Sequence, residues 1–127
     1  MSLYKSKTYL NDIKIAVTSI VNADRLNNTK ILITGAGGII GSAIVDCLIM
    51  LRELSGFNIE IYALGRSKDR LEKRFCNYSM CDYIHLVEHD VCNRLDLDKT
   101  IDLVIHTAGN AYPSAFDKYP VDTIMTN

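Results

Sequence analysis

The chain has 127 residues, of which 48% are hydrophobic and 23% charged, and its formal net charge is -1. This balance is typical of a soluble globular domain, and the lack of a basic surplus argues against a nucleic-acid-binding protein. No apolar run reaches the roughly 20 residues of a membrane span, and the polar residues 1–10 lack the apolar core of a signal peptide. We therefore expect a cytoplasmic protein with no membrane contact.

Near the N-terminus, apolar residues recur at three- and four-residue steps, which predicts an amphipathic helix over residues 8–22. The apolar positions are Leu10, Ile13, Val17, Ile20 and Val21. A polar stretch, residues 22–29, separates this helix from the rest of the chain. We therefore divide the chain into an N-terminal helix with its linker, residues 1–29, and a second unit, residues 30–127.

Short apolar runs alternate with helical patterns throughout the second unit. The expected strands are residues 30–34, 59–64, 83–88 and 101–106. The expected helices are residues 40–54, which Gly56 ends, residues 68–75, which Ser67 caps, and a last helix that begins at Pro120. This alternation predicts an α/β fold, in which a parallel sheet of about four strands has right-handed crossovers and helices on both faces.

A glycine-rich loop directly follows the first expected strand and opens a helix. Gly35, Gly38 and Gly41 are three residues apart. In such a loop the first glycine permits a tight turn, the second lets the backbone approach a pyrophosphate, and the third allows close packing of helix on strand. The free N–H groups and the helix dipole then face the phosphate charge. The alternative is a glycine-rich turn that binds nothing; a P-loop is excluded because no Gly-Lys-Ser/Thr follows.

The loop, spelled Thr34-Gly35-Ala36-Gly37-Gly38-Ile39-Ile40-Gly41, resembles the T-G-x-x-G-x-x-G motif of the short-chain dehydrogenase/reductase superfamily, in its extended branch of nucleotide-sugar epimerases and dehydratases. Three later segments resemble that branch in the same order along residues 30–127. They are Asp90-Val91, His106-Thr107-Ala108-Gly109, and Pro120 to Asn127. The resemblance implies a Rossmann-type NAD(P)-binding domain in which His106 is a structural position.

The resemblance also implies which residues contact the cofactor. They are Gly35, Gly38, Ile39, Ile40, Gly41, Asp90, Val91, Thr107, Ala108 and Gly109. Asp90 has an alternative role, which is to cap the loop that follows the third strand.

The end of the second strand bears on the choice of nucleotide. A carboxylate there would bind the ribose hydroxyls and repel a 2′-phosphate, but none occurs before Asp69. Arg66 could instead form a forked contact to a 2′-phosphate, or stack on the adenine. We therefore favour NADP slightly over NAD. The alternative is that Arg66, Lys68 and Arg70 form a solvated helix start.

Catalytic residues are expected elsewhere. The resemblance implies a Tyr-x-x-x-Lys pair, but none of the seven tyrosines has a lysine four residues on. We name no catalytic residue, and the four cysteines and three histidines show no metal-ligand spacing. We expect the inactive cofactor-binding part of a longer NAD(P)-dependent epimerase or dehydratase whose substrate is a nucleotide sugar. The alternatives are a non-catalytic dinucleotide-binding module and an atypical NADPH-dependent reductase.

A sheet that stops at its fourth strand leaves an edge unpaired, and such an edge pairs readily with another copy. We therefore expect a homo-oligomer that forms through this edge.

Overall fold

A computed structural model of the chain describes residues 3–110 and 113–126. Its centre is a sheet of four parallel strands in the order β3-β2-β1-β4. The strands are β1 Thr29–Thr34, β2 Ile59–Gly65, β3 Ile84–Glu88 and β4 Leu103–His106. Because all the strands are parallel, their carboxyl ends lie at one edge of the sheet. The predicted Rossmann-type parallel sheet is confirmed.

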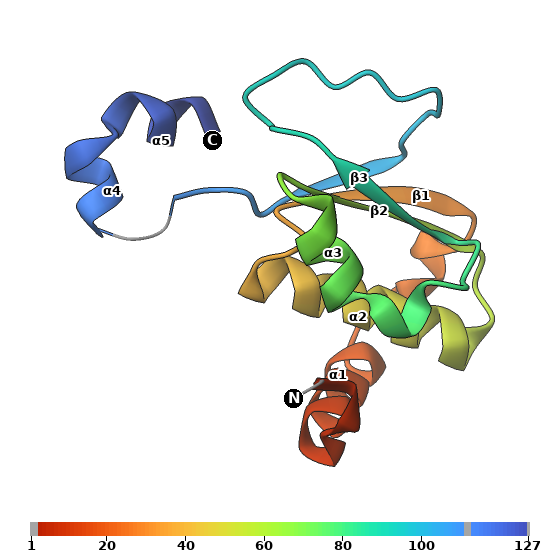
Figure 1. Cartoon of the computed structure of the whole chain (residues 1–127). Helices are drawn as coiled ribbons and strands as arrows, with labels where there is room; N and C mark the ends of the chain where they lie inside the picture. The colour runs from red at the N-terminus through yellow and green to blue at the C-terminus, as the bar shows by residue number, and fades with distance from the viewer. Residues whose placement is uncertain (1–2, 111–112, 127) are drawn as a thin grey trace.

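The helices that pack on this sheet lie in layers on one face, whereas the sequence predicted helices on both faces; a loop lies along the other face (Figure 1). The helices are α1 Lys7–Thr18, α2 Ile39–Ser55, α3 Lys68–Arg74, α4 Pro113–Lys118 and α5 Pro120–Thr126. Short 3-10 turns span Leu3–Lys5, Ala23–Leu26 and Cys76–Tyr78. Helices α2 and α3 lie against the sheet, α1 lies on the far side of α2, and α4 and α5 lie beyond the carboxyl edge.

The main core lies between the sheet and α2. Alternate side chains of the two central strands, including Ile31, Ile33 and Ile61, are fully buried because they face the apolar stripe of α2. Val45 and Ile49 are the buried centre of that stripe. Helix α1 adds its own buried side chains to the same cluster, so the N-terminal helix and the sheet share one core.

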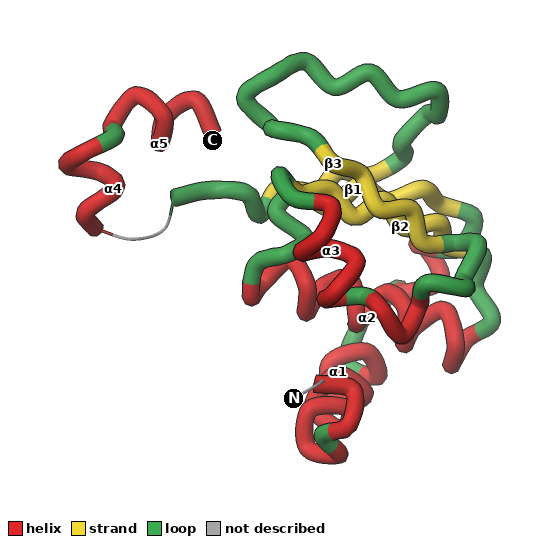
Figure 2. Tube along the Cα trace, viewed as in Figure 1, coloured by secondary structure: helices red, strands yellow, loops and turns green. Residues whose placement is uncertain are grey.

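The opposite face of the sheet carries a smaller cluster built on Leu32, Tyr62 and Leu64. The side chains packed on it come from the end of β3 and from the segment between β3 and β4, residues 89–102. They are Val87, Val91, Leu95, Leu97 and Ile101. Figure 2 shows this segment as a long loop without helix or strand along that side of the sheet. The loop brings residues 89–92 to the carboxyl edge.

The largest differences from the sequence prediction concern two helices. The first helix ends at Thr18 instead of residue 22, and Ile20 and Val21 are 40% and 81% exposed. The hydroxyls of Thr18 and Ser19 donate to the carbonyl of Ile15, and Asn22 has a left-handed backbone conformation, so the chain leaves the helix here. Helix α4 was not anticipated, because its six residues have too short a repeat to detect.

Three predicted helix-terminus residues are confirmed. Ser67 caps α3, Gly56 ends α2 and Pro120 begins α5. Asn127, the last residue of the family-like Pro120 segment, lies outside the described residues. Among the described helices, none combines the length and the apolar character needed to cross a membrane.

Candidate functional site

The loop between β1 and α2 is a tight turn at the carboxyl edge of the sheet. The N–H of Ala36 donates to the carbonyl of Leu64 at 3.0 Å, which ties the loop to β2. The N–H of Gly38 donates to the carbonyl of Gly35 at 2.9 Å. Gly35 has a φ of 66°, a left-handed conformation that favours glycine. The backbone therefore reverses sharply before α2 begins.

Two glycines of the loop are required by close packing. A Cβ at Gly35 would lie 2.7 Å from the backbone nitrogen of Ala108. A Cβ at Gly41 would lie 2.4 Å from the carbonyl oxygen of Gly35 and 2.6 Å from Oγ1 of Thr107. The first turn of α2 can therefore press against the loop and the residues after β4 only if both positions lack side chains. At Gly37, by contrast, a Cβ would meet only the Leu71 side chain, at 3.7 Å.

The N-terminus of α2 is suited to an anion. Gly38 supplies no side-chain cap, and the N–H of Ser42 makes the first backbone bond of the helix, to the Gly38 carbonyl. The amides before Ser42 have no carbonyl one turn earlier in the helix, and the first turn holds no acidic residue. These N–H groups and the helix dipole therefore favour a negative charge at the loop.

A polar seam joins the end of β1 to the residues after β4. The hydroxyl of Thr34 accepts the N–H groups of Thr107 and Ala108 at 3.2 and 3.3 Å, so its own proton is free to be donated to Nδ1 of His106, 2.8 Å away. The other ring nitrogen, Nε2, then carries the proton and donates to the Thr126 carbonyl at 2.9 Å. Both nitrogens of His106 are thus engaged by the protein, as expected of a structural residue.

A cavity of about 710 Å³ opens at this edge, between the loop, the start of α3, residues 89–92 and α5. Most of the residues that the sequence analysis assigned to the cofactor line it. These are Gly35, Gly38, Arg66, Asp90, Val91, Thr107, Ala108 and Gly109. Gly41 lies buried beneath the loop, and the side chains of Ile39 and Ile40 are 92% and 68% exposed and do not line the cavity.

Other residues line the cavity that the sequence did not predict. They include Ser67, His89, Cys92, Asn110, Tyr119, Asp122 and Thr126. Those beside a predicted residue, such as Ser67 and His89, could have been inferred from their place at a strand end. Tyr119 and Asp122 could not, because the folding of α5 back onto the carboxyl edge leaves no periodic signal.

The cavity is lined by charged groups of both signs. Arg66 and Arg70 are exposed side chains at the end of β2 and the first turn of α3. Asp90 follows β3, and its carboxylate accepts the Cys92 N–H at 3.0 Å. That hydrogen bond is the main reason that the pKa of Asp90 is lowered, with a smaller contribution from the Arg66 charge. The capping role of Asp90 is therefore confirmed, whereas its contact with adenine stays a prediction.

A family comparison supports this assignment of the edge. The model of the NAD dependent epimerase/dehydratase family matches residues 31–127, from the first strand through α5. The chain belongs to this NAD-dependent epimerase/dehydratase family. The resemblance noted in the glycine loop is thereby confirmed over the sheet and its helices.

Curated relatives of this epimerase/dehydratase-family chain are UDP-glucuronic acid decarboxylases of Arabidopsis thaliana. Decarboxylase 6 is 35% identical over 101 residues, which are 80% of this chain and 27% of the relative. Decarboxylase 2 is 30% identical over 122 residues, which are 96% of this chain and 26% of the relative. The chain thus spans about a quarter of the length of these relatives.

The residues at the carboxyl edge fit the dinucleotide of an epimerase/dehydratase-family protein. The cavity volume lies in the range of cofactor pockets. The close approach of backbone at Gly35 and Gly41 leaves the N-terminus of α2 uncovered for a pyrophosphate. Within residues 3–110 and 113–126, no cluster of His, Cys, Asp and Glu could hold a metal ion.

Proposed function

We propose that the cavity binds NAD(P) with its pyrophosphate at the N-terminus of α2. The observation that carries this proposal is the packing of Gly35 and Gly41 against Thr107 and Ala108, which brings the backbone of Gly35, Gly37 and Gly38 to the cavity at the start of α2. The adenosine end would lie toward Arg66 and Asp90, because these residues line the cavity at the ends of β2 and β3. Gly38, Val91 and Gly109 would complete the walls.

Amide chemical shifts measured during a titration with NAD(H) and NADP(H) test this placement. The largest changes are expected in residues 35–41, with a second group in residues 66–70 and 89–91. Shifts confined to the opposite ends of the strands would contradict it. The three glycine positions 37, 38 and 41 give separate signals, so the pyrophosphate end is reported independently of the adenosine end.

For the longer protein, we propose an NAD(P)-dependent enzyme that acts on a nucleotide sugar, as the names of its relatives suggest. When bound, the nicotinamide would supply a reversible acceptor for a hydride from a hydroxyl-bearing sugar carbon. The residues described here would bind and orient the dinucleotide and take no part in proton transfer. Mass spectrometry of UDP-glucuronic acid and other UDP-sugars incubated with the longer protein tests this activity; no change in any of them would contradict it.

We further propose that Arg66 gives the cavity a preference for NADP(H). Replacing Arg66 with Ala would remove a charge-assisted contact to the 2′-phosphate and lower NADP(H) affinity by about tenfold, equivalent to about 1.4 kcal/mol, while NAD(H) affinity changes little. The matched control is Arg94→Ala, because Arg94 is an exposed arginine, 88% accessible, on the loop outside the cavity. Equal losses for the two dinucleotides in the Arg66 variant would contradict the role.

The sheet has an open edge at β4 among the described residues. On the side away from β1, β4 has no partner strand among the described residues, and Leu103 and Val104 are 40% and 56% exposed. An open strand edge with apolar side chains invites pairing with another chain. We therefore propose that a second copy associates through β4.

A further inference from the structure

A buried ion pair links the two helices that lie on the sheet. Asp46 of α2 and Arg74 of α3 form this pair, and their side chains are only 3% and 16% exposed. Removing two charges from water is costly, and the cost is recovered only when the remaining hydrogen-bonding positions of both groups are filled. The groups that fill them therefore help to decide whether α2 and α3 are held together.

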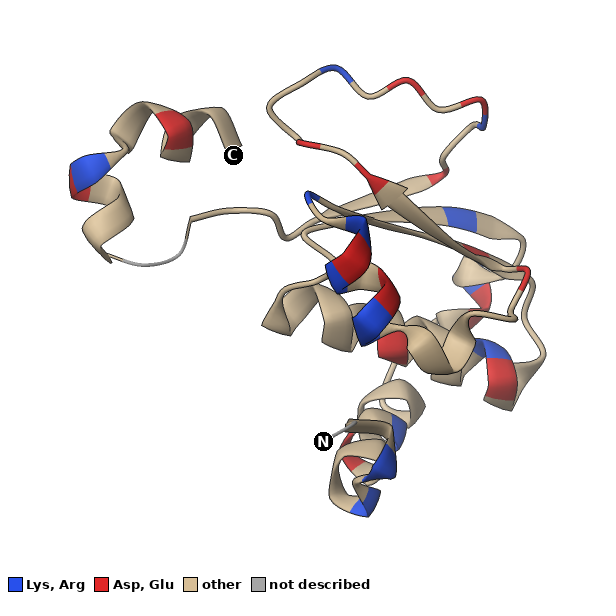
Figure 3. Ribbon diagram, in the orientation of Figure 1, with Lys and Arg blue, Asp and Glu red and all other residues tan. Residues whose placement is uncertain are grey.

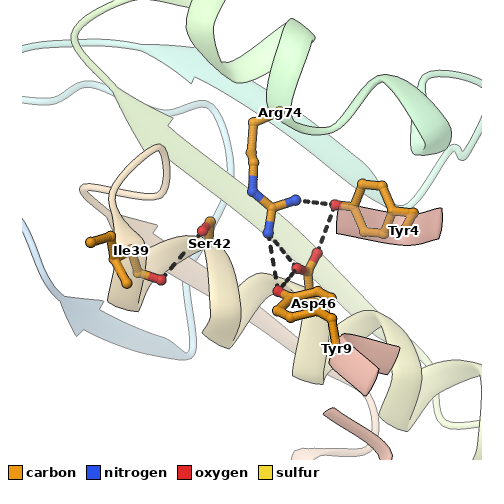
Figure 4. A network of polar contacts seen from close by, with 6 residues as sticks. All are labelled: Tyr4, Tyr9, Ile39, Ser42, Asp46 and Arg74. Carbon is orange, nitrogen blue, oxygen red and sulfur yellow. Dashed lines mark hydrogen bonds and ion pairs between the residues drawn. The ribbon is translucent and has the colours of Figure 1, made fainter. Parts of the chain in front are cut away.

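The N-terminal segment supplies those groups (Figure 4). The hydroxyl of Tyr4 donates to one oxygen of Asp46 at 2.8 Å, and the hydroxyl of Tyr9 donates to the other. The guanidinium of Arg74 donates in turn to both phenol oxygens. Two tyrosines from one end of the chain thus complete a polar network between α2 and α3. The two charged residues of this network, Asp46 and Arg74, are 28 residues apart in sequence.

The same segment is fixed by packing as well. The Arg74 guanidinium lies 5.2 Å from the ring centroid of Tyr4, and that ring packs edge-on against Tyr78 at 5.1 Å. Ile13 and Val17 are buried in the main core. Since the whole segment precedes residue 31, where the match to the family model begins, it lies outside the matched part of the domain.

The N-termini of both linked helices border the cavity. Helix α2 begins beside Gly38, and α3 begins beside Ser67 and Arg70, which also line the cavity. Asp46 and Arg74 each lie about two turns farther along their helices. Figure 3 colours much of α3 as charged residues and the first part of α2 as uncharged, so the ion pair joins a charged helix to a mostly uncharged one.

We propose that residues 3–18 act as a brace that fixes the spacing of the N-termini of α2 and α3, and so raises the affinity for a ligand that spans both. Tyr4, Tyr9, Asp46 and Arg74 are positioning residues in this proposal. The ligand part rests on the proposed binding of a dinucleotide, whose pyrophosphate and adenosine ends would meet α2 and α3. Holding both helix ends in the bound arrangement lowers the ordering cost of binding.

The test is the double variant Tyr4→Phe/Tyr9→Phe, which keeps both rings and removes both hydroxyls. Amide hydrogen exchange is expected to become faster in α3 and in the second turn of α2, residues 43–46, while β1 and β2 stay as protected as in the unchanged chain. We expect the affinity for NAD+ or NADP+, whichever the unchanged chain binds more tightly, to fall three- to tenfold. The single variant Tyr9→Phe should give a smaller effect in the same direction.

The matched control is Tyr62→Phe, which removes a phenol hydroxyl bonded to Glu60 on the opposite face of the sheet. It should leave α3 exchange and dinucleotide affinity unchanged. The brace would be overturned if amide exchange in α3 were unchanged in the double variant, or if it rose equally in the strands. It would also be overturned if dinucleotide affinity were unchanged although exchange became faster. If the unchanged chain binds neither dinucleotide, the proposed function fails, and the exchange measurement still decides whether the brace exists.

Discussion

At the scale of single residues, the glycine loop shows that its glycines are not equivalent. Gly41 is buried, and a Cβ there would meet backbone of Gly35 and the hydroxyl of Thr107, neither of which can move without disturbing the β1–β4 seam. Gly37 is exposed, and a Cβ there would make an ordinary contact with Leu71. The spacing alone treats these positions as members of one motif, whereas the packing assigns them different constraints.

Gly41→Ala is therefore expected to destabilise the chain by about 1–3 kcal/mol through overpacking and to weaken dinucleotide binding. Gly37→Ala, the matched control, should change the free energy of unfolding by less than about 0.5 kcal/mol. Urea denaturation of both variants measures the difference. Similar stabilities for the two would contradict the close approach at Gly41.

The phenol of Tyr9 predicts a dependence of stability on alkaline pH. Burial, together with the bond to Asp46, raises the pKa of Tyr9 to about 12 from an ordinary value of 10.0. The folded state then holds the proton more tightly than the unfolded chain, so this contribution is complete below pH 10 and is lost between pH 10 and 12. Urea midpoints should fall across that window.

In Tyr9→Phe the fall in midpoint should be smaller, though still present because burial also raises the pKa values of Tyr4 and Tyr78. An identical pH profile for the variant and the unchanged chain would show that Tyr9 does not contribute.

At the scale of the elements, α2 and α3 depend on a charge pair as well as on apolar packing. Asp46→Asn would leave the Arg74 guanidinium without its counter-charge in a mostly buried position. Breaking a buried pair in this way typically costs about 3–5 kcal/mol. Urea denaturation should show a loss of this order for Asp46→Asn. Glu53→Gln, on the exposed side of the same helix, should change stability by no more than about 0.5 kcal/mol; equal effects would contradict the role of the pair.

The elements also show what the sequence could and could not predict. Strands and long helices were found because their apolar repeats match the buried faces, and the ends at Ser67, Gly56 and Pro120 were found because cap residues act locally. The end of α1 was missed because Ile20 and Val21 continue the apolar repeat without being buried.

The parts of the candidate site that the sequence did not predict have a different cause. Asp122 lines the cavity together with residues far from it in sequence. Tyr4 and Tyr9 likewise bond to Asp46, which is far from them in sequence. Neither arrangement produces a periodic pattern, because each uses isolated polar side chains. The sequence therefore predicted the glycine loop and the residues at the strand ends. It did not predict the contacts that the N-terminal segment and α5 make with the rest of the chain.

At the scale of the whole molecule, apolar side chains are exposed in the last elements of the chain. Besides β4, the short helix α5 exposes Val121, Ile124 and Met125 at 68%, 73% and 59%. Where exposed apolar side chains form a patch, the patch is typically an interaction site. The proposed association of copies through β4 would cover part of this exposed apolar surface.

Light scattering across a dilution series tests the association. The unchanged chain should show a mass that rises with concentration, and Val104→Lys should remain monomeric because a lysine on a strand edge opposes pairing. Val21→Lys places the same charge at a more exposed valine of the N-terminal linker and should associate like the unchanged chain. A strict monomer at all concentrations would contradict the proposal.

We propose above all that the carboxyl edge of this sheet holds a dinucleotide on the N-terminus of α2. Calorimetric titration of the chain with NAD(H) and NADP(H) tests it most directly. Saturable one-to-one binding is expected, and Gly41→Ala, whose Cβ would press on the loop, should weaken it strongly. Absence of binding for both dinucleotides, or binding by Gly41→Ala equal to that of the unchanged chain, would contradict it.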